Sequence, residues 1–281
     1  MQIGGRKYFD PLEKMEEKIL FNEKSIISKW IANMYEQEIN ETDDVEFLLS
    51  LIGRPQKRIL EVCCGSGRIL VPLAKAGHRV SGFDADMYML GKIPAKAEGL
   101  SNIEWQKADA VHSDWGTGFD VVVLAGNILF NIVSDMDYEK AQELLIRKAA
   151  SALVPGGYVY IEYQPGGHKL KQRGESNKDS DDLIVWEGND CDGNYGKMTL
   201  IAGAYDSHTQ PDTFTRRFEL KLKNGEKIQQ DIPCVKHFAS LDQVHKWLSN
   251  NGFIIDREYE DYNQNPINEN SGKVIIYAKK G

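Results

Sequence analysis

The chain has 281 residues, 41% of them hydrophobic and 27% charged, a composition typical of a globular protein with one large domain or one domain and an insert. Its net charge of −8 argues against a large nucleic-acid footprint. A polar N-terminus and the lack of any run of about 18 apolar residues indicate neither a secretory signal nor a membrane span. Four cysteines, two of them adjacent, form no disulfide or zinc framework, so we expect a cytoplasmic protein without a metal.

Two helices are expected before the first strand. Apolar residues at helical spacing predict one helix over residues 15–35 and another over residues 43–52, with Thr42 as the N-cap of the second. The Gly-Arg-Pro of residues 53–55 ends this second helix. Residues 1–56 are therefore expected to form a helical cap.

A strand, a turn of small residues and a helix follow the cap. Residues 58–62 are strand-like, residues 63–67 read Cys-Cys-Gly-Ser-Gly, and a helical pattern that begins at Arg68 stops at Gly77. Such a turn lets a ligand approach bare backbone beside the positive end of the helix. A dinucleotide fingerprint would need a third glycine where Leu70 stands, so a nicotinamide oxidoreductase is disfavoured.

The second strand also ends in an acid. It covers residues 79–83 and is followed by Asp84, whose carboxylate can accept both ribose hydroxyls of a nucleoside. Asp86 is expected to cap the next helix. Within that helix, Met89 and Leu90 are expected to be core residues rather than ligand contacts.

Three more strands complete this pattern. A short strand over residues 103–106 precedes a continuous apolar run over residues 119–125, which predicts a central parallel strand buried on both faces. A helix over residues 138–153 ends at the Pro-Gly-Gly of residues 155–157, and a strand over residues 158–163 follows. The alternation of strands and helices predicts an α/β fold.

Five of these segments resemble, in order and spacing, the motifs of class I S-adenosylmethionine-dependent methyltransferases: LEVCCGSGR, GFDADMYML, KADA, FDVVVLAGNILFNI and ALVPGGYVYIEY. The LAGN within the fourth is similar to the glycine/sarcosine N-methyltransferase-like branch, which acts on small molecules. The resemblance implies S-adenosyl-L-methionine as cofactor and S-adenosyl-L-homocysteine as product. It also implies a Rossmann-like sheet of seven mostly parallel strands with helices on both faces.

The resemblance further implies individual roles. Glu61 meets the amino group of the methionine moiety, while Asp109 and the backbone amide of Ala110 meet the adenine. The complete set of implied cofactor residues is Glu61, Cys63, Gly65, Ser66, Gly67, Asp84, Ala85, Asp109, Ala110 and Ala125.

On the substrate side, we expect Asn127 and Gln164 to face the methyl acceptor and Tyr35 to belong to the lid. Glycine methyltransferases carry an arginine where Gln164 stands, and a neutral amide cannot replace a bidentate charge clamp. Free glycine is therefore disfavoured, and an amine or hydroxyl on a sugar, a polyamine-like compound or another small metabolite is favoured. The candidate catalytic residues are Asn127, Tyr163, His168 and His237.

After residue 164 the pattern changes to a polar loop and then to alternating apolar and polar residues joined by turn signals. This predicts an antiparallel insert of three or four strands on the C-terminal edge of the parallel sheet, where it could close over the substrate or form a homodimer contact. A helix over residues 240–251, with Ser240 as its N-cap, and strands over residues 253–258 and 273–279 complete the core. The chain is thus divided into a helical cap over 1–56, a cofactor-binding core over 57–164 and 238–281, and an insert over 165–237.

Two alternatives remain open. The chain could be a catalytically silent S-adenosylmethionine-binding interaction module, or it could methylate protein or RNA. The acidic charge balance makes RNA the less expected partner.

Overall fold

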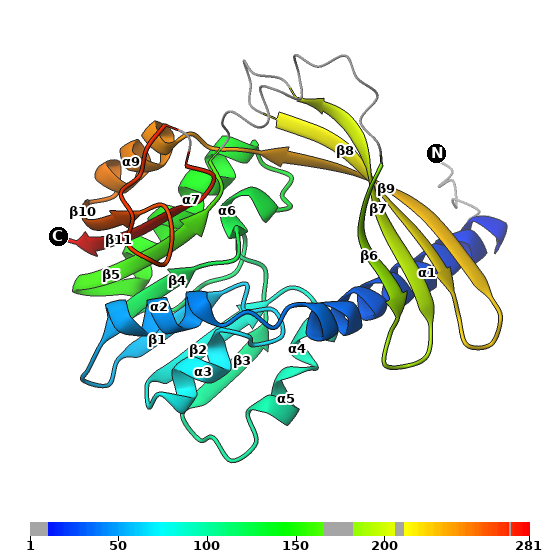
Figure 1. The fold of residues 1–281 in the computed structure, drawn as a ribbon, viewed down its shortest axis with the longest axis horizontal. Coiled ribbons are helices and arrows are strands. Elements are labelled where there is room, and N and C mark those ends of the chain that lie inside the picture. Colours follow the sequence, from blue (N-terminus) through cyan, green and yellow to red (C-terminus); the bar gives the residue numbers. More distant parts are fainter. Residues whose placement is uncertain (1–10, 166–181, 206–210, 270) are drawn as a thin grey trace, which may run out of the picture.

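Two β-sheets organise the chain (Figure 1). The computed structural model describes residues 11–165, 182–205, 211–269 and 271–281. The larger sheet has seven strands in the order β10-β11-β5-β4-β1-β2-β3. These strands are β1 Arg58–Val62, β2 Arg79–Asp84, β3 Ile103–Lys107, β4 Phe119–Leu124, β5 Leu153–Tyr163, β10 Phe253–Tyr259 and β11 Val274–Lys280.

Strand direction confirms the expected doubly wound topology. Strands β1 to β5 pair in parallel, whereas β11 runs antiparallel to β5 and β10 runs antiparallel to β11. From β1 the chain winds outward to β2 and β3, and it then returns to the other side of β1 to form β4 and β5. The carboxyl ends of β1 and β4 therefore border a topological switch point, where folds of this type bind ligands.

Helices cover both faces of this sheet, as expected. On β4, Val122 and Leu124 face the core formed with α6, α7 and α9, whereas Val121 and Val123 face the core formed with α2, α3 and α5. This two-sided burial explains the uninterrupted apolar run of β4. The helices are α2 Asp43–Ile52, α3 Leu70–Lys75, α4 Met87–Leu90, α5 Ile93–Lys96, α6 Ile128–Asn131, α7 Tyr138–Ala152 and α9 Leu241–Asn250. No helix in the described ranges is long and apolar enough to cross a membrane.

Two of the three expected helix caps are confirmed. Asp86 accepts from the backbone amides of Tyr88 and Met89 at the start of α4, and Ser240 forms a capping box with Gln243 at the start of α9. Thr42 makes no side-chain capping bond at the start of α2. Its φ of −125° and ψ of −9° lie outside the extended region from which an N-cap side chain can reach the first free amides.

The insert forms a separate four-stranded antiparallel sheet in the order β6-β7-β8-β9. The expectation that it joins the edge of the parallel sheet is wrong. Its inner face instead packs on the long helix α1, Pro11–Glu38 (Figure 1). Ile27, Trp30 and Met34 of this helix are buried in one cluster with Met198 and Phe218. The four strands are β6 Leu183–Asn189, β7 Tyr195–Tyr205, β8 Pro211–Lys221 and β9 Lys227–His237.

Trp30 shows how closely α1 and the insert fit together. A Cβ atom on Gly196 of β7 would lie 2.3 Å from Cε2 of the Trp30 ring, so the indole rests on bare strand backbone. Trp30 is only 1% exposed, so its side chain is a packing residue between α1 and the insert. The apolar face of the insert is thereby covered by a helix from the other end of the chain.

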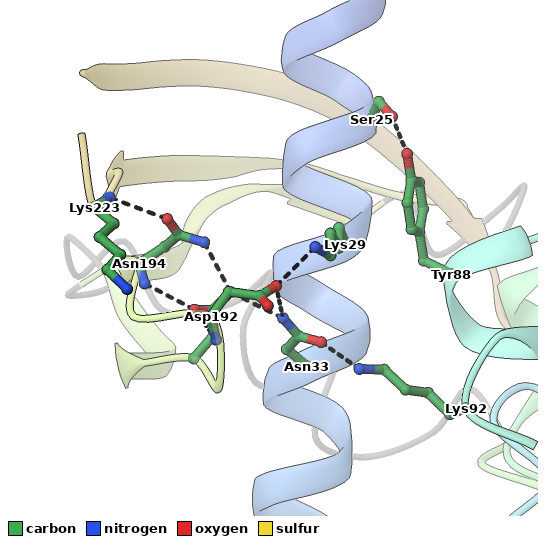
Figure 2. Close-up of polar contacts among 9 residues, drawn as sticks. Ser25, Lys29, Asn33, Tyr88, Lys92, Asp192, Asn194 and Lys223 are labelled. Atoms are coloured by element: carbon green, nitrogen blue, oxygen red, sulfur yellow. Dashed lines mark hydrogen bonds and ion pairs between the residues drawn. The ribbon is translucent and has the colours of Figure 1, made fainter. Parts of the chain in front are cut away.

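Helix α1 also connects the insert to the core (Figure 2). Buried Asn33 donates from Nδ2 to Asp190 Oδ2 at 3.0 Å and to Asp192 Oδ2 at 2.9 Å, both in the turn between β6 and β7. Its Oδ1 accepts a hydrogen bond from Lys92, which lies between α4 and α5. A single amide therefore joins the β6–β7 turn, α1 and the segment that follows β2.

Candidate active site

A cleft of about 410 Å³ lies at the carboxyl edge of the parallel strands. Three predicted acids line it, and each comes from a different strand end. Glu61 lies in β1, Asp84 is the last residue of β2 and Asp109 follows β3. Its lining residues are Tyr35, Glu61, Cys63, Cys64, Gly65, Arg68, Ile69, Asp84, Ala85, Met89, Asp109, Ala110, Val111, Ala125, Gly126, Ile128, Asn131, Ile132 and Val133. Eight of the ten predicted cofactor residues are in this set, and Ser66 and Gly67 are not.

The loop after β1 turns sharply because three of its residues have a left-handed backbone. The φ angles are 56° at Cys63, 53° at Gly65 and 78° at Gly67. Cys63 therefore occupies a conformation that favours glycine, which is the residue the resembling family usually carries there. The turn also places the Gly65 amide 2.9 Å from Asp84 Oδ2, so the first two strands are joined at the cleft.

Gly67 lies behind the cleft wall and is held there by packing. A Cβ atom at this position would come 3.0 Å from Ile93 Cγ1 and 3.2 Å from Val71 Cγ2. Gly77 offers a matched control, because its φ of 95° is also left-handed but nothing lies within 4 Å of its virtual Cβ.

We expect Gly67→Ala to lower the free energy of unfolding by ~1–3 kcal/mol more than Gly77→Ala, since it adds overpacking to the same backbone strain. Urea unfolding of both variants measures the difference. Equal losses would show that the contacts behind the loop can relax without cost.

Glu61 is the most perturbed acid of the cleft. It is 4% exposed, and its Oε2 has no hydrogen-bond partner among the described residues. Burial raises its pKa to about 8; Arg68 opposes this shift and Asp84 adds to it. A buried carboxylate oxygen without a partner, facing a cleft, fits a ligand ammonium group such as the methionine amino group of S-adenosylmethionine.

Asp84 is held in place by the backbone around it. Its Oδ2 accepts from the Gly65 amide, and its Oδ1 accepts from the Asp86 amide at 2.8 Å. Burial raises the pKa of this carboxyl, and the two backbone donors counteract the shift. The remaining lone pairs of both oxygens can accept hydrogen bonds from the hydroxyls of a ribose.

The loop that carries Asp109 depends on a lysine from another element. Asp109 Oδ1 accepts from the amides of Val111 and His112 at 2.9 and 2.8 Å, so the side chain also stabilises its own turn. Lys148 of α7 donates to three backbone carbonyls of this loop, including those of Ala110 at 3.1 Å and Val111 at 2.7 Å. No sequence motif pointed to Lys148, because its partners are backbone atoms far away in the chain.

Arg68 forms hydrogen bonds to α1, to α2 and to the segment between them, beside the cleft. Its two terminal nitrogens donate to the carboxylate of Asp44 at 2.7 and 2.5 Å, and Nη1 also donates to the Glu41 carbonyl at 3.1 Å. Its Nε lies 3.3 Å from the hydroxyl of Tyr35, the predicted lid residue, which lines the cleft with Arg68 itself. Arg68 belongs to the first motif, but no neighbouring residue in the chain indicates its partners.

The methyl-acceptor side differs from expectation. Asn127 has a left-handed φ of 61° at the start of α6 and is not among the lining residues, whereas Asn131, one helical turn later, is. Met89 also lines the cleft, so its expected core position is wrong, while Leu90 is buried as expected. The one-turn helix α6 therefore contributes Ile128 and Asn131 to the lining of the cleft, whereas Asn127, its N-cap, is not a lining residue.

The remaining candidates do not line the cleft. Tyr163 is 1% exposed within the core of the sheet, and burial raises the pKa of its hydroxyl. His237 is also buried, and its Nδ1 lies 2.7 Å from Gln142 Oε1. Gln164 follows β5 and is not a lining residue, and His168 lies outside the described residues.

Comparison with known proteins agrees with this geometry. Residues 59–157 match the family model described as a methyltransferase domain. A Geobacillus sp. (strain WCH70) protein whose methyltransferase name is itself provisional is 24% identical over 229 residues, which cover 80% of this chain and 85% of that one. The 23S rRNA (uracil(1939)-C(5))-methyltransferase RlmD of Aeromonas salmonicida (strain A449) is 26% identical over 140 residues, which cover 44% of this chain and 32% of that protein.

Solved structures share the whole architecture. An S-adenosylmethionine-dependent methyltransferase from Clostridium acetobutylicum ATCC 824 is similar with a TM-score of 0.68 at 13% identity, covering 89% of this chain and 98% of that one. The sugar N-methyltransferase KedS8 from Streptoalloteichus sp ATCC 53650 gives a TM-score of 0.61 at 14% identity, with 98% of both chains covered. The chain therefore contains a methyltransferase domain over residues 59–157, within a fold that it shares with S-adenosylmethionine-dependent methyltransferases.

Proposed function

We propose that the chain transfers a methyl group to an amine nitrogen or a hydroxyl oxygen of a small molecule. The single observation that carries the proposal is the cleft of about 410 Å³, whose lining combines three acids with apolar residues and the amide of Asn131. The sugar N-methyltransferase with the same architecture supports a small acceptor.

The charge of the cleft suits the cofactor. When bound, S-adenosylmethionine supplies a methyl group on a positively charged sulfur. Asp84 and Asp109, joined by Glu61 once it ionises, give the cleft a negative potential, which favours a cationic ligand and opposes a pyrophosphate. The role of the protein is then to orient donor and acceptor, and orientation of this kind can supply roughly 7–11 kcal/mol of the barrier.

The insert supports a small acceptor over a macromolecule. Asn131 lines the cleft and accepts a hydrogen bond from Lys236 of β9, at 2.6 Å between Oδ1 and Nζ. The insert therefore reaches the wall of the cleft. An acceptor bound beside this contact would lie between the cleft and the insert, which fits a metabolite better than an RNA duplex or a folded protein.

We test the proposal by methyl transfer from labelled S-adenosylmethionine to three fractions of a cell extract: small metabolites, RNA and protein. Label is expected in the metabolite fraction, and Asp84→Asn should reduce it at least tenfold because the ribose loses its charged acceptor. Asp231→Asn, an exposed position of the insert, serves as the control.

Label confined to RNA or protein would assign the enzyme to a macromolecular acceptor. Binding of S-adenosylhomocysteine without any labelled product in the three fractions would favour a silent cofactor-binding module.

A further inference from the structure

Two cations lie on the inner face of the insert, beyond the part that α1 covers. Phe214 and Arg216 are two residues apart on β8, so they share one face with Phe218, which packs on α1. The Arg216 guanidinium lies 5.9 Å from the centroid of the Phe214 ring, and Lys236 Nζ from β9 lies 5.8 Å from the same centroid. One aromatic ring is therefore flanked by both cations.

This cationic pair adjoins the cleft. Lys236 Nζ donates to Asn131 Oδ1 at 2.6 Å and lies 4.4 Å from the centroid of the Phe130 ring, and both partners belong to α6. Phe130 in turn packs on Phe238 at a centroid separation of 5.0 Å. The pair thus contacts the wall of the cleft through Asn131, which is a lining residue.

The positive charge of the pair is only partly balanced. Arg216 Nε is buried and has no hydrogen-bond partner among the described residues. Among the described residues of β8 and β9, the acid that shares this face is Asp212, which lies opposite Lys236 in the β8–β9 register. Burial, and next the charge of Arg216, lower the pKa of Lys236 to about 8, which shows that an additional anion would be stabilising here.

We propose that Arg216 and Lys236 bind an anionic group of the methyl acceptor, a carboxylate or a phosphate, and thereby direct its nucleophile towards the cleft. The inference rests on the proposed function and narrows its substrate class. A guanidinium offers the planar donor pair that both oxyanions match, and an ammonium beside it adds a point charge. The aromatic side chains around the pair, Phe130, Phe214 and Phe238, would exclude water from the contact and strengthen it.

The direct test is a binding measurement. Protein saturated with S-adenosylhomocysteine is titrated by calorimetry with sodium phosphate and, separately, with sodium acetate at constant ionic strength. We expect at least one anion to bind, with the preferred anion identifying the group, and we expect Lys236→Met and Arg216→Met each to weaken its binding at least tenfold. Arg217→Met is the matched control, since Arg217 is the adjacent residue, faces the other side of β8 and pairs with Asp231.

Unchanged affinity for S-adenosylhomocysteine shows that each variant is folded. The proposal is overturned if neither anion binds the wild-type protein, or if binding survives both substitutions. In the labelling experiment the methylated product should be retained on an anion exchanger, and a neutral or cationic product would also overturn it. Failure to find any labelled metabolite would instead count against the proposed function, and the titration would still decide the anion site.

Discussion

Glu61→Gln is expected to stabilise the ligand-free protein above pH 8. The same substitution is expected to weaken S-adenosylhomocysteine binding at least tenfold. Both effects follow from one carboxyl group that is 4% exposed, with one oxygen unpaired among the described residues. Glutamine keeps the shape of the side chain and cannot ionise. It therefore removes the cost of a buried charge in the free protein and the attraction for an ammonium in the complex.

The sign of the pH dependence follows from the raised pKa. Burial moves the pKa of Glu61 from 4.5 to about 8 in the folded state, so between these values the folded chain holds a proton that the unfolded chain has released. The stability that the neutral carboxyl contributes is fully present below pH 4.5 and is lost as the pH rises through 8. The whole shift corresponds to roughly 5 kcal/mol, and the glutamine variant should lose this pH dependence.

Urea unfolding at pH 5, 7 and 9 measures the stability effect, and calorimetric titration over the same range measures binding. Wild-type affinity for S-adenosylhomocysteine should rise towards pH 8, because the ionised carboxylate binds the ligand ammonium, and the variant should not show this rise. Glu219→Gln, at an exposed position of β8, is the control. Equal affinity in Glu61→Gln and wild type would show that the ammonium binds elsewhere.

Arg68→Met is expected to cost about 3–5 kcal/mol of stability, because it leaves the Asp44 carboxylate buried without its charged partner. The arginine accounts for both charged hydrogen bonds to Asp44 and also holds the Glu41 carbonyl and the Tyr35 hydroxyl. Cofactor affinity should fall as well, since Tyr35 and the start of α2 lose their attachment to the cleft.

Arg217→Met separates this effect from the loss of an arginine as such. Arg217 also forms a bidentate pair, with Asp231 at 2.8 and 2.7 Å, but both groups are exposed on the insert and solvent screens them. Denaturant unfolding should therefore show a large loss for Arg68→Met and little change for Arg217→Met. Restoration of Arg68→Met by the double variant with Asp44→Leu would confirm that the unpaired acid is the cause, and a larger loss in the double variant would contradict it.

Features encoded by adjacent residues could be predicted from the sequence. The β1 turn, the acids after β1, β2 and β3, and the apolar run of β4 all signal their structure within a few residues of chain. Parallel strands bring their carboxyl ends to one edge, so local predictions about Glu61, Asp84 and Asp109 together gave a common cleft. The four insert strands were likewise predictable from period-two patterns and turn residues.

Features that depend on contacts between distant residues could not be predicted. Three of these contacts are hydrogen bonds between different elements. They join Arg68 to Asp44, Lys148 to backbone carbonyls, and Lys236 to Asn131. The same limit explains the misplaced insert, because an apolar strand face specifies that something covers it but not which element does so. In α6, the choice of Asn131 over Asn127 depends on the direction of a one-turn helix, which no periodicity reveals.

The attachment of α1 to the second sheet has a consequence for engineering and for divergence. The unit formed by α1 and the second sheet is built from two pieces of sequence that lie more than a hundred residues apart, with Trp30 packed on Gly196 and Asn33 hydrogen-bonded to Asp190. A chimera that imports strands β6 to β9 from a relative would leave the resident α1 against a foreign surface. Substrate range should therefore be transferable only when the first helix and the four strands are exchanged together, as a single cassette.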